Sequence, residues 1–339
     1  MGADVIAAEK NPTAWLLQLA AGFGIFQALN VAARLGIADA LTDGAKSVDV
    51  LAPQVAAEPQ MLYRVLRALA SVGVFAEERE GSFSNTPASK MLITGAPGSL
   101  RGFVMLAGSA ECWRAWGDLH YSVETGKPAF DHVYGEPLFD YLSKNPGLAR
   151  IFDEAMAGRS AAEISALLVA YDFSSAGHLV DVGGGNGALM NAVLAKYPQL
   201  SGTVFDLPHV VEAASGHKAN EQRLRFAAGN FFTDVPVKGD TYMLKKVIHD
   251  WPDDRARDIL SRCREAMSDG SRLLVIESIV PANQAPTFMT FLDLWMLVFA
   301  GGRERTQEEF RTLLQSAGLH LSRIVPTGSP VSVIEALPV

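Results

Sequence analysis

Hydrophobic periodicity gives the first part of the chain a helical pattern that ends in a hairpin. Residues 14–41 place apolar side chains at three- and four-residue spacing, which predicts a helix. A second, shorter helix is expected at 48–56, and a third, EPQMLYRVLRALASVG, ends at Gly73. The alternating segment VFAEEREGSFSN turns at Gly81, as a β-hairpin does. Three helices followed by a hairpin predict a winged-helix-like domain over residues 1–100.

The pattern changes along the rest of the chain. Residues 101–170 are mostly helical in pattern, interrupted by a loop at 124–137, and form a predicted connector. From residue 171 onward, short apolar runs alternate with helical segments: HLVDV, TVFDL, RFAAG, TYMLKKV and RLLVIES. Such alternation predicts a parallel sheet with helices on both faces, and the last two runs, LHLSRIV and PVSVIEAL, predict an edge hairpin. We therefore expect an α/β domain over 171–339.

Composition and charge narrow the class of protein. The chain of 339 residues, with 49% hydrophobic and 19% charged residues, is typical of a folded globular protein of two domains. Its net charge of −8 argues against nucleic acid or an anionic membrane as a partner. The cysteines, Cys112 and Cys263, suggest neither a disulfide framework nor a zinc site. No secretory signal or apolar stretch near the ~20 residues of a spanning helix is evident, so we expect a soluble cytoplasmic protein.

A glycine-rich loop follows the first strand of the predicted sheet. In LVDVGGGNGALM, residues 179–190, the glycines let the backbone turn sharply and approach a ligand closely. Asp206 ends the next strand, where a carboxylate can accept hydrogen bonds from ribose hydroxyls. Because the loop also satisfies a relaxed dinucleotide pattern, it predicts an adenosine-bearing cofactor and leaves NAD open.

His249 stands where the fourth strand of the predicted sheet ends. Ligands of open α/β sheets bind at the carboxyl ends of the strands. Glu277 ends the adjacent strand, on the same rim, and Glu304 follows a helix from which it can approach. A general base is therefore predicted at His249. The other histidines, at positions 120, 132, 178, 209, 217 and 320, are expected to be structural, with a place at the border of the pocket left open for 120 and 132.

Six motifs in order make the chain similar to a known family. LVDVGGGNG, VFDLPHVV, RFAAGNFFTDVP, LKKVIHDWPDD, LLVIES and GGRERTQEEF span nearly the whole sequence. They resemble the S-adenosylmethionine-dependent small-molecule O-methyltransferases of the plant caffeic-acid and bacterial natural-product type. The resemblance implies a class I methyltransferase Rossmann-like sheet behind an N-terminal dimerisation domain. It also implies a homodimer, S-adenosylmethionine as cofactor and S-adenosylhomocysteine as product.

The resemblance assigns roles to individual residues. It implies that Glu277 and Glu304 orient or flank His249. The residues implied to bind the cofactor are Asp181, Gly183, Gly185, Asp206, Leu207, Asn230, Phe231, Lys245 and Trp251. Two positions depart from the family pattern: Asn230-Phe231 stands where Asp-Met is usual, and Trp295 where asparagine is common.

The acceptor is expected to be a flat, acidic hydroxyl compound. With histidine near pKa 6.5 and a phenol near 10, deprotonation is uphill by about 5 kcal/mol, against about 12 kcal/mol for an alcohol near 15.7. A phenol or enol of an aromatic molecule therefore fits a histidine base. The residues predicted to line the substrate site are Trp113, Trp116, Phe130, Phe152, Met156, Asp250, Trp295, Met296 and Phe299. The sequence does not identify the acceptor or the hydroxyl that is methylated.

The sequence raises three further possibilities: a metal site and two other functions. Asp253 and Asp254 suit the first turn of a helix better than a metal site, so no metal is expected. A winged-helix transcriptional regulator is the first alternative, but the acidic pair Glu77-Glu78 in the hairpin should repel phosphate. An NAD-dependent oxidoreductase is the second, and only the glycine loop favours it.

Overall fold

The structure is a computed structural model that describes residues 11–214, 222–281 and 288–339. His217 and the first ten residues therefore lie outside the described residues. The chain forms two compact units, Met1–Trp113 with Leu142–Ser160, and Arg114–Tyr141 with Ala161–Val339. The predicted boundaries at residues 100 and 170 stay a prediction.

The first unit contains the predicted helices and hairpin. Its helices are α2 (Pro12–Arg34), α3 (Ile37–Ala40), α4 (Val48–Gln54), α5 (Pro59–Ser71), α6 (Pro87–Lys90) and α7 (Arg101–Ala107). Strands β2 (Phe75–Arg79) and β3 (Ser82–Asn85) form the hairpin, and β1 (Lys46–Ser47) pairs with β3. The single helix predicted over 14–41 is wrong, because Gly36 adopts φ +66° and separates α2 from α3. The core of this unit includes Leu51, Leu66 and Phe83.

Helix α2 is unusually apolar for a surface helix. It is long and apolar enough to cross a membrane by length and composition alone, although only 17% of its most apolar window is buried. The expectation that no apolar stretch approaches the length of a membrane-spanning helix is therefore wrong. A few polar residues interrupt the apolar run, but they are too sparse to lower the mean hydropathy of this 23-residue helix much. Leu16, Leu17, Leu19 and Phe23 are each more than half exposed.

The middle of the chain is helical, as predicted, and its helices belong to both units. They are α8 (Ala110–Gly117), α9 (Leu119–Thr125), α10 (Ala129–Tyr134), α11 (Leu138–Lys144) and α12 (Pro146–Ala170). The loop predicted at 124–137 contains α10. Gly126, at φ +69°, ends α9, and Gly135, at φ +76°, ends α10, so a short helix forms within the predicted break.

The second unit is built on a seven-stranded sheet of order β11-β12-β8-β7-β4-β5-β6. Its strands are β4 (His178–Val182), β5 (Ser201–Asp206), β6 (Leu224–Ala228), β7 (Thr241–Lys245), β8 (Arg272–Glu277), β11 (Leu319–Pro326) and β12 (Ser332–Pro338). Strands β4 to β8 of this sheet pair in parallel, whereas β12 and β11 are antiparallel at one edge. The predicted parallel sheet with an edge hairpin is confirmed.

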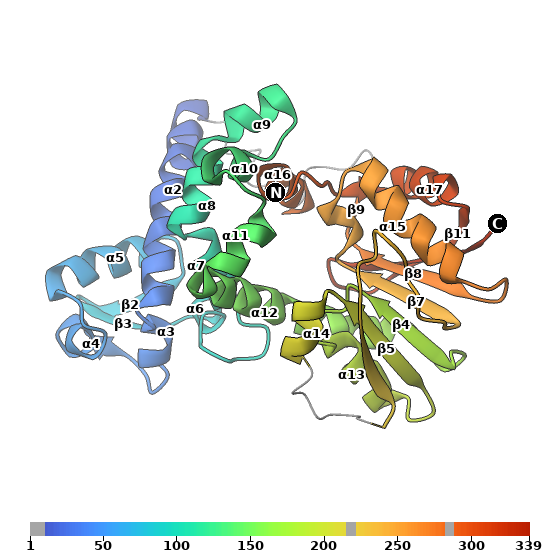
Figure 1. Ribbon diagram of the computed structural model, residues 1–339. Coiled ribbons are helices and arrows are strands. Elements are labelled where there is room, and N and C mark those ends of the chain that lie inside the picture. Colours follow the sequence, from blue (N-terminus) through green and yellow to red (C-terminus); the bar gives the residue numbers. More distant parts are fainter. Residues whose placement is uncertain (1–10, 215–221, 282–287) are drawn as a thin grey trace. The chain divides into compact units, whose positions relative to one another are not determined.

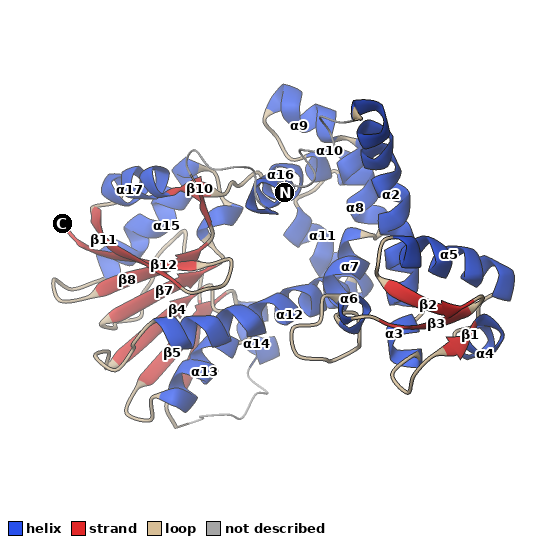
Figure 2. Cartoon of the chain, turned by 180° about the vertical axis from the view of Figure 1, so that it is seen from behind, coloured by secondary structure: helices blue, strands red, loops and turns tan. Residues whose placement is uncertain are grey.

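Helices cover both faces of this sheet. On one face, α15 (Asp253–Ala266) and α17 (Gln307–Ser316) bury Ile259 and Leu314 against the strands (Figure 1). On the other, α13 (Ala188–Lys196) and the second half of α12 bury Met190 and Leu167 (Figure 2). Two further helices, α14 (Pro208–Ala214) and α16 (Phe288–Phe299), and the short pair β9 (Ile279–Val280) and β10 (Arg305–Thr306) complete the unit.

The strand order changes direction between β4 and β7, and this fixes where a ligand can bind. The chain runs from β4 outward to β5 and β6, then returns to place β7 on the other side of β4. At such a switch point the loops after neighbouring strands diverge and leave a crevice at their carboxyl ends. The glycine loop follows β4, and His249 follows β7, so both lie at this end of the sheet.

Candidate active site

A tight turn carries His249 away from the end of β7. Lys246 adopts φ +56°, a left-handed conformation rare for a residue with a side chain, and its N–H still donates to Ile276 O at 3.1 Å. A single 3₁₀ turn, η1 (Ile248–Asp250), follows directly. The turn buries His249, of which only 8% remains exposed.

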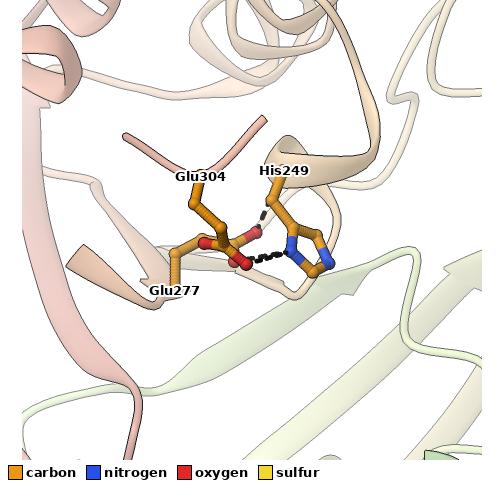
Figure 3. A group of neighbouring side chains, drawn as sticks. All are labelled: His249, Glu277 and Glu304. Atoms are coloured by element: carbon orange, nitrogen blue, oxygen red, sulfur yellow. Dashed lines mark hydrogen bonds and ion pairs between the residues drawn. The ribbon is translucent and has the colours of Figure 1, made fainter. Parts of the chain in front are cut away.

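Two buried glutamates hold one side of the His249 ring (Figure 3). Nδ1 lies 2.9 Å from Glu304 Oε1 and 3.9 Å from Glu277 Oε2. The backbone N–H of His249 donates to Glu277 Oε1 at 3.3 Å. Both glutamate side chains are fully buried, and Figure 3 shows the second ring nitrogen, Nε2, pointing away from them. With Nδ1–H donated to a carboxylate, Nε2 is left as the proton acceptor. The structure thus brings together the three residues predicted from the sequence.

The charges around the ring favour a basic histidine. Burial alone would lower the pKa of His249, but Glu277, Asp250 and Glu304 outweigh it and raise the pKa above its ordinary value. The positive charge of Lys246 acts in the opposite direction and lowers the pKa of His249. Its Nζ lies 3.7 Å from a carboxylate oxygen of each glutamate. Asp250 Oδ1 lies 3.5 Å from Nε2, and burial raises the pKa of Asp250 to about 6.

The segment after α16 locks this turn in place. Arg303 N donates to His249 O at 2.9 Å, and a Cβ at Gly302 would overlap that same carbonyl oxygen. Glu304 N donates to Asp293 Oδ1 on α16 at 2.8 Å. Sequence reasoning missed Gly302, although the glycine pair in GGRERT was a signal for a close backbone approach.

The glycine loop packs directly beside the turn that carries His249. Gly183, Gly185 and Gly187 all have positive φ, between +57° and +75°. A Cβ at Gly183 would lie 2.8 Å from Val247 Cγ2, two residues before His249. Only glycine can bring the loop this close to the turn, so the glycine loop and the turn that carries His249 are packed against one another.

Asp181 is suited to hold a cationic group of the cofactor. It is 1% exposed, and neither carboxylate oxygen has a hydrogen-bond partner among the residues that the structure describes. Burial raises its pKa to about 7, although Lys245 opposes the rise. A buried carboxylate of this kind fits an ammonium group such as that of the methionine part of S-adenosylmethionine.

Asp206 and Leu207 have a structural role that the sequence did not indicate. Asp206 Oδ2 accepts from Gly185 N at 2.8 Å, and Oδ1 accepts from Leu207 N at 2.7 Å. The carboxylate therefore shapes the glycine loop. Each of its oxygens has a further lone pair, so it can still accept a hydrogen bond from a ribose hydroxyl.

Aromatic rings gather beyond the glycine loop, around the other predicted cofactor residues. Phe232, which the sequence reasoning missed, lies 4.7 Å from the Trp251 ring, and Phe231 lies 6.3 Å from it. Asn230 Oδ1 accepts from Phe232 N at 2.9 Å and so fixes this turn. The arrangement offers flat surfaces for an adenine ring.

Lys245, predicted to lie near the cofactor, is held in a buried ion pair. Its Nζ lies 2.6 Å from Glu163 Oε2 on α12, a residue that the sequence did not indicate. Because Lys245 still lowers the pKa of Asp181, the two belong to one charged group around the glycine loop.

Only some of the predicted substrate residues cluster. Trp295 and Phe299 stack at 4.9 Å on α16, and Trp116 packs edge-on to Trp295 at 5.6 Å. Phe130 contacts Phe299 but is fully buried, and Met296 is buried as well. Three others belong to the first unit, Trp113, Phe152 and Met156, and Asp250 lies beside His249 Nε2. Trp116 and Trp295 are half-buried, which leaves part of each indole surface accessible.

Spacing alone would also allow a cation at the base. One ligand atom each from His249, Glu277 and Glu304 lies within 4.8 Å of the others. Asp253, considered from the sequence as a metal ligand, instead pairs with Arg305 at 2.7 Å. Metal independence therefore stays a prediction.

The sheet order, the glycine loop after β4 and the carboxylate after β5 define a class I methyltransferase. Family models agree: one described as an O-methyltransferase domain matches residues 116–320, and one described as an O-methyltransferase dimerisation domain matches residues 17–95. The chain belongs to this O-methyltransferase family, as its motifs predicted, and is an S-adenosylmethionine-dependent O-methyltransferase. The oxidoreductase and regulator alternatives are not favoured.

Similar proteins cover nearly the whole chain. The phenazine O-methyltransferase of Lysobacter antibioticus is 42% identical over 96% of this chain and 96% of its own length. The solved structure of a mitomycin 7-O-methyltransferase is 35% identical with a TM-score of 0.90, covering 98% of this chain and all of the other. The O-methyltransferase from neocarzinostatin biosynthesis, 32% identical with a TM-score of 0.79 over 93% and 96%, was crystallised with S-adenosylmethionine and 2-hydroxy-5-methyl naphthoic acid.

Proposed function

We propose that the enzyme methylates a phenolic or enolic hydroxyl of an aromatic small molecule, with His249 as general base and without a metal. The contact that carries the proposal is the 2.9 Å approach of Glu304 Oε1 to His249 Nδ1, which leaves Nε2 facing away from both glutamates (Figure 3). Asp181, the glycine loop and Asp206 would hold S-adenosylmethionine, which supplies an electrophilic methyl group on a sulfonium.

The proton transfer follows from this geometry. Nε2 takes the hydroxyl proton as the oxygen becomes a nucleophile, and Glu304 and Glu277 stabilise the imidazolium that forms. A phenol near pKa 10 lies about 5 kcal/mol above histidine in its ordinary state, and the raised pKa of His249 narrows that gap. Deprotonation of an ordinary alcohol by this histidine would still be too unfavourable.

The aromatic class of acceptor is supported by the ring cluster and by relatives. Trp295 and Phe299 stack and Trp116 packs edge-on to both, and all three residues belong to the same unit as His249. Relatives named for phenazine, puromycin, mitomycin and a hydroxybenzoate carry out O-methylation. Trp295, which replaces the asparagine common in the family, should favour a flat acceptor that stacks on an indole.

We further propose a homodimer formed through the first unit. The exposed apolar side chains of α2 belong to the part of the chain matched by the dimerisation domain. A second copy covering this face would explain an apolar helix in a protein with no proposed membrane or nucleic-acid partner. Phe23 and Phe26 are the residues we expect to reach the partner's substrate site. Light scattering should give twice the 36.4 kDa mass of the chain, and a monomer at micromolar concentration would contradict this.

Two measurements test the proposed function. Calorimetry should show heat of binding for S-adenosylmethionine and none for NAD. Mass spectrometry of a library of hydroxylated phenazines, naphthoates and benzoates, incubated with S-adenosylmethionine, should show products heavier by one methylene. No mass gain in this library, together with a gain for aliphatic alcohols tested in parallel, would contradict the assignment. The cytoplasmic location stays a prediction.

A further inference from the structure

Arg305 is a buried arginine whose side chain binds the chain on both sides of His249. It is 0% exposed. Nη1 donates to Ile248 O at 3.0 Å, and Nη2 donates to Trp251 O at 2.9 Å. His249 and Asp250 lie between these two carbonyl groups, so the guanidinium spans the turn that carries the base.

Asp253 neutralises this buried cation. Nε and Nη2 of Arg305 donate to Asp253 Oδ1 at 2.9 and 2.7 Å. Asp253 is the first residue of α15, and its side chain is largely exposed. The pair therefore joins the beginning of α15 to the turn, and a buried guanidinium requires such a partner.

The same arginine is joined through the backbone to both glutamates. It follows Glu304 directly, and in the parallel pair β9–β10 it stands opposite Ile279, two residues after Glu277. A rigid fork of donors on Arg305 thus sets the turn bearing His249 against the segments bearing its two carboxylate partners.

We infer that Arg305, with Asp253, is a positioning residue that holds the His249 ring in register with Glu304. Its consequence for turnover rests on the proposed function of His249. A lysine would keep the charge, but its single ammonium cannot reproduce a planar fork across two carbonyl groups and a carboxylate. Misplacement of a base by about 1 Å can cost about 10²-fold in rate.

The test uses Arg305→Lys and Asp253→Asn in the full-length protein. Asp258→Asn is the matched control, because Asp258 lies on α15 and is comparably exposed, and within the described part of the chain its carboxylate has only a 3.9 Å contact with Arg257. The signal is the Nδ1 proton of His249 in ¹⁵N-histidine-labelled protein, assigned by its loss in His249→Gln. In both test variants we expect this resonance to broaden or vanish, with S-adenosylhomocysteine affinity by calorimetry within about threefold of wild type.

Turnover of a monohydroxyphenazine supplies the second readout. Arg305→Lys and Asp253→Asn should lower kcat by about 10- to 100-fold with little change in KM for the cofactor, and the control should match wild type. If Arg305→Lys does not fold, Asp253→Asn alone tests the inference. This variant should fold, because the Asp253 side chain is mostly in solvent. An unchanged Nδ1 resonance in the folded variants, or a wild-type spectrum without it, overturns the inference. Full turnover by His249→Ala would instead refute the proposed base, and the resonance would still decide the role of Arg305.

Discussion

Replacing Asp181 by asparagine should stabilise the cofactor-free protein at alkaline pH and remove much of its affinity for S-adenosylmethionine. The carboxylate is buried without a hydrogen-bond partner among the described residues, and Lys245, the cation that lowers its pKa, is already paired with Glu163. An ionised group in this position is costly until a cationic ligand arrives. Asparagine has nearly the same shape, which matters because a Cβ at Gly184 would lie 2.7 Å from Asp181 Cγ.

The magnitude follows from the pKa. Burial raises the pKa of Asp181 from 3.8 to about 7, so between these pH values the folded protein holds a proton that the unfolded chain releases. The free energy of unfolding therefore falls as pH rises through this window, and the loss is complete above about pH 7. A rise from 3.8 to about 7 corresponds to about 4 kcal/mol. Asparagine cannot ionise, so Asp181→Asn does not suffer this loss.

Urea unfolding of the cofactor-free protein at pH 5 and pH 8 measures the effect. The variant should be more stable than wild type by about 2 kcal/mol at pH 5 and by up to about 4 kcal/mol at pH 8, at equal m-values. Asp258→Asn, on the surface of α15, should show no such pH-dependent difference. Calorimetry should show S-adenosylhomocysteine binding weakened by about 1.5–3 kcal/mol, the range for a hydrogen bond to a charged group. A difference in stability that does not change with pH, or an unchanged affinity, would refute the reasoning.

Three other changes probe the rest of the site. His249→Ala should lower turnover by about 10²–10⁴-fold, less for a phenol already ionised at assay pH, and leave cofactor affinity nearly intact; full activity on a neutral phenol would rule out the base. Asp206→Ala should weaken cofactor binding by about 1.5–3 kcal/mol, and unchanged calorimetry would remove Asp206 from the site. Turnover should survive EDTA despite the close spacing of His249 and its glutamates, whereas loss restored by magnesium would establish a metal.

The elements of this fold that could be predicted were those determined by residues close together in the sequence. Strand and helix periodicity, and glycines needed at positive φ, identified the sheet, the cofactor loop and the position of His249 after β7. Glu277 could be placed near His249 because the carboxyl ends of parallel strands meet at one edge, whereas the role of Glu304 was implied by the family resemblance. The break at Gly36 escaped prediction because the apolar spacing continues through it, and φ is not visible in a hydrophobic pattern.

Other features depend on contacts between distant segments. Arg305 lies more than fifty residues from Ile248, and nothing in GGRERT indicates that its guanidinium binds the turn around His249. Likewise, Glu163 belongs to an ordinary helical pattern until the fold brings it to Lys245. The hydrogen bond from Gly185 N to the Asp206 carboxylate is of the same kind, because a carboxylate at a strand end can bind the ligand, the loop or both.

Helix α16 has two structural roles that depend on different residues, and one of them is the hydrogen bond from Glu304 N to Asp293. Asp293 anchors the segment that carries a partner of the base, while Trp295 and Phe299, on the same helix, form the aromatic surface. If the proposed function holds, exchange of these two rings would change acceptor preference and leave the hydrogen bond that anchors Glu304 intact. A library aimed at altered specificity should therefore vary positions 295 and 299 and hold 293 constant.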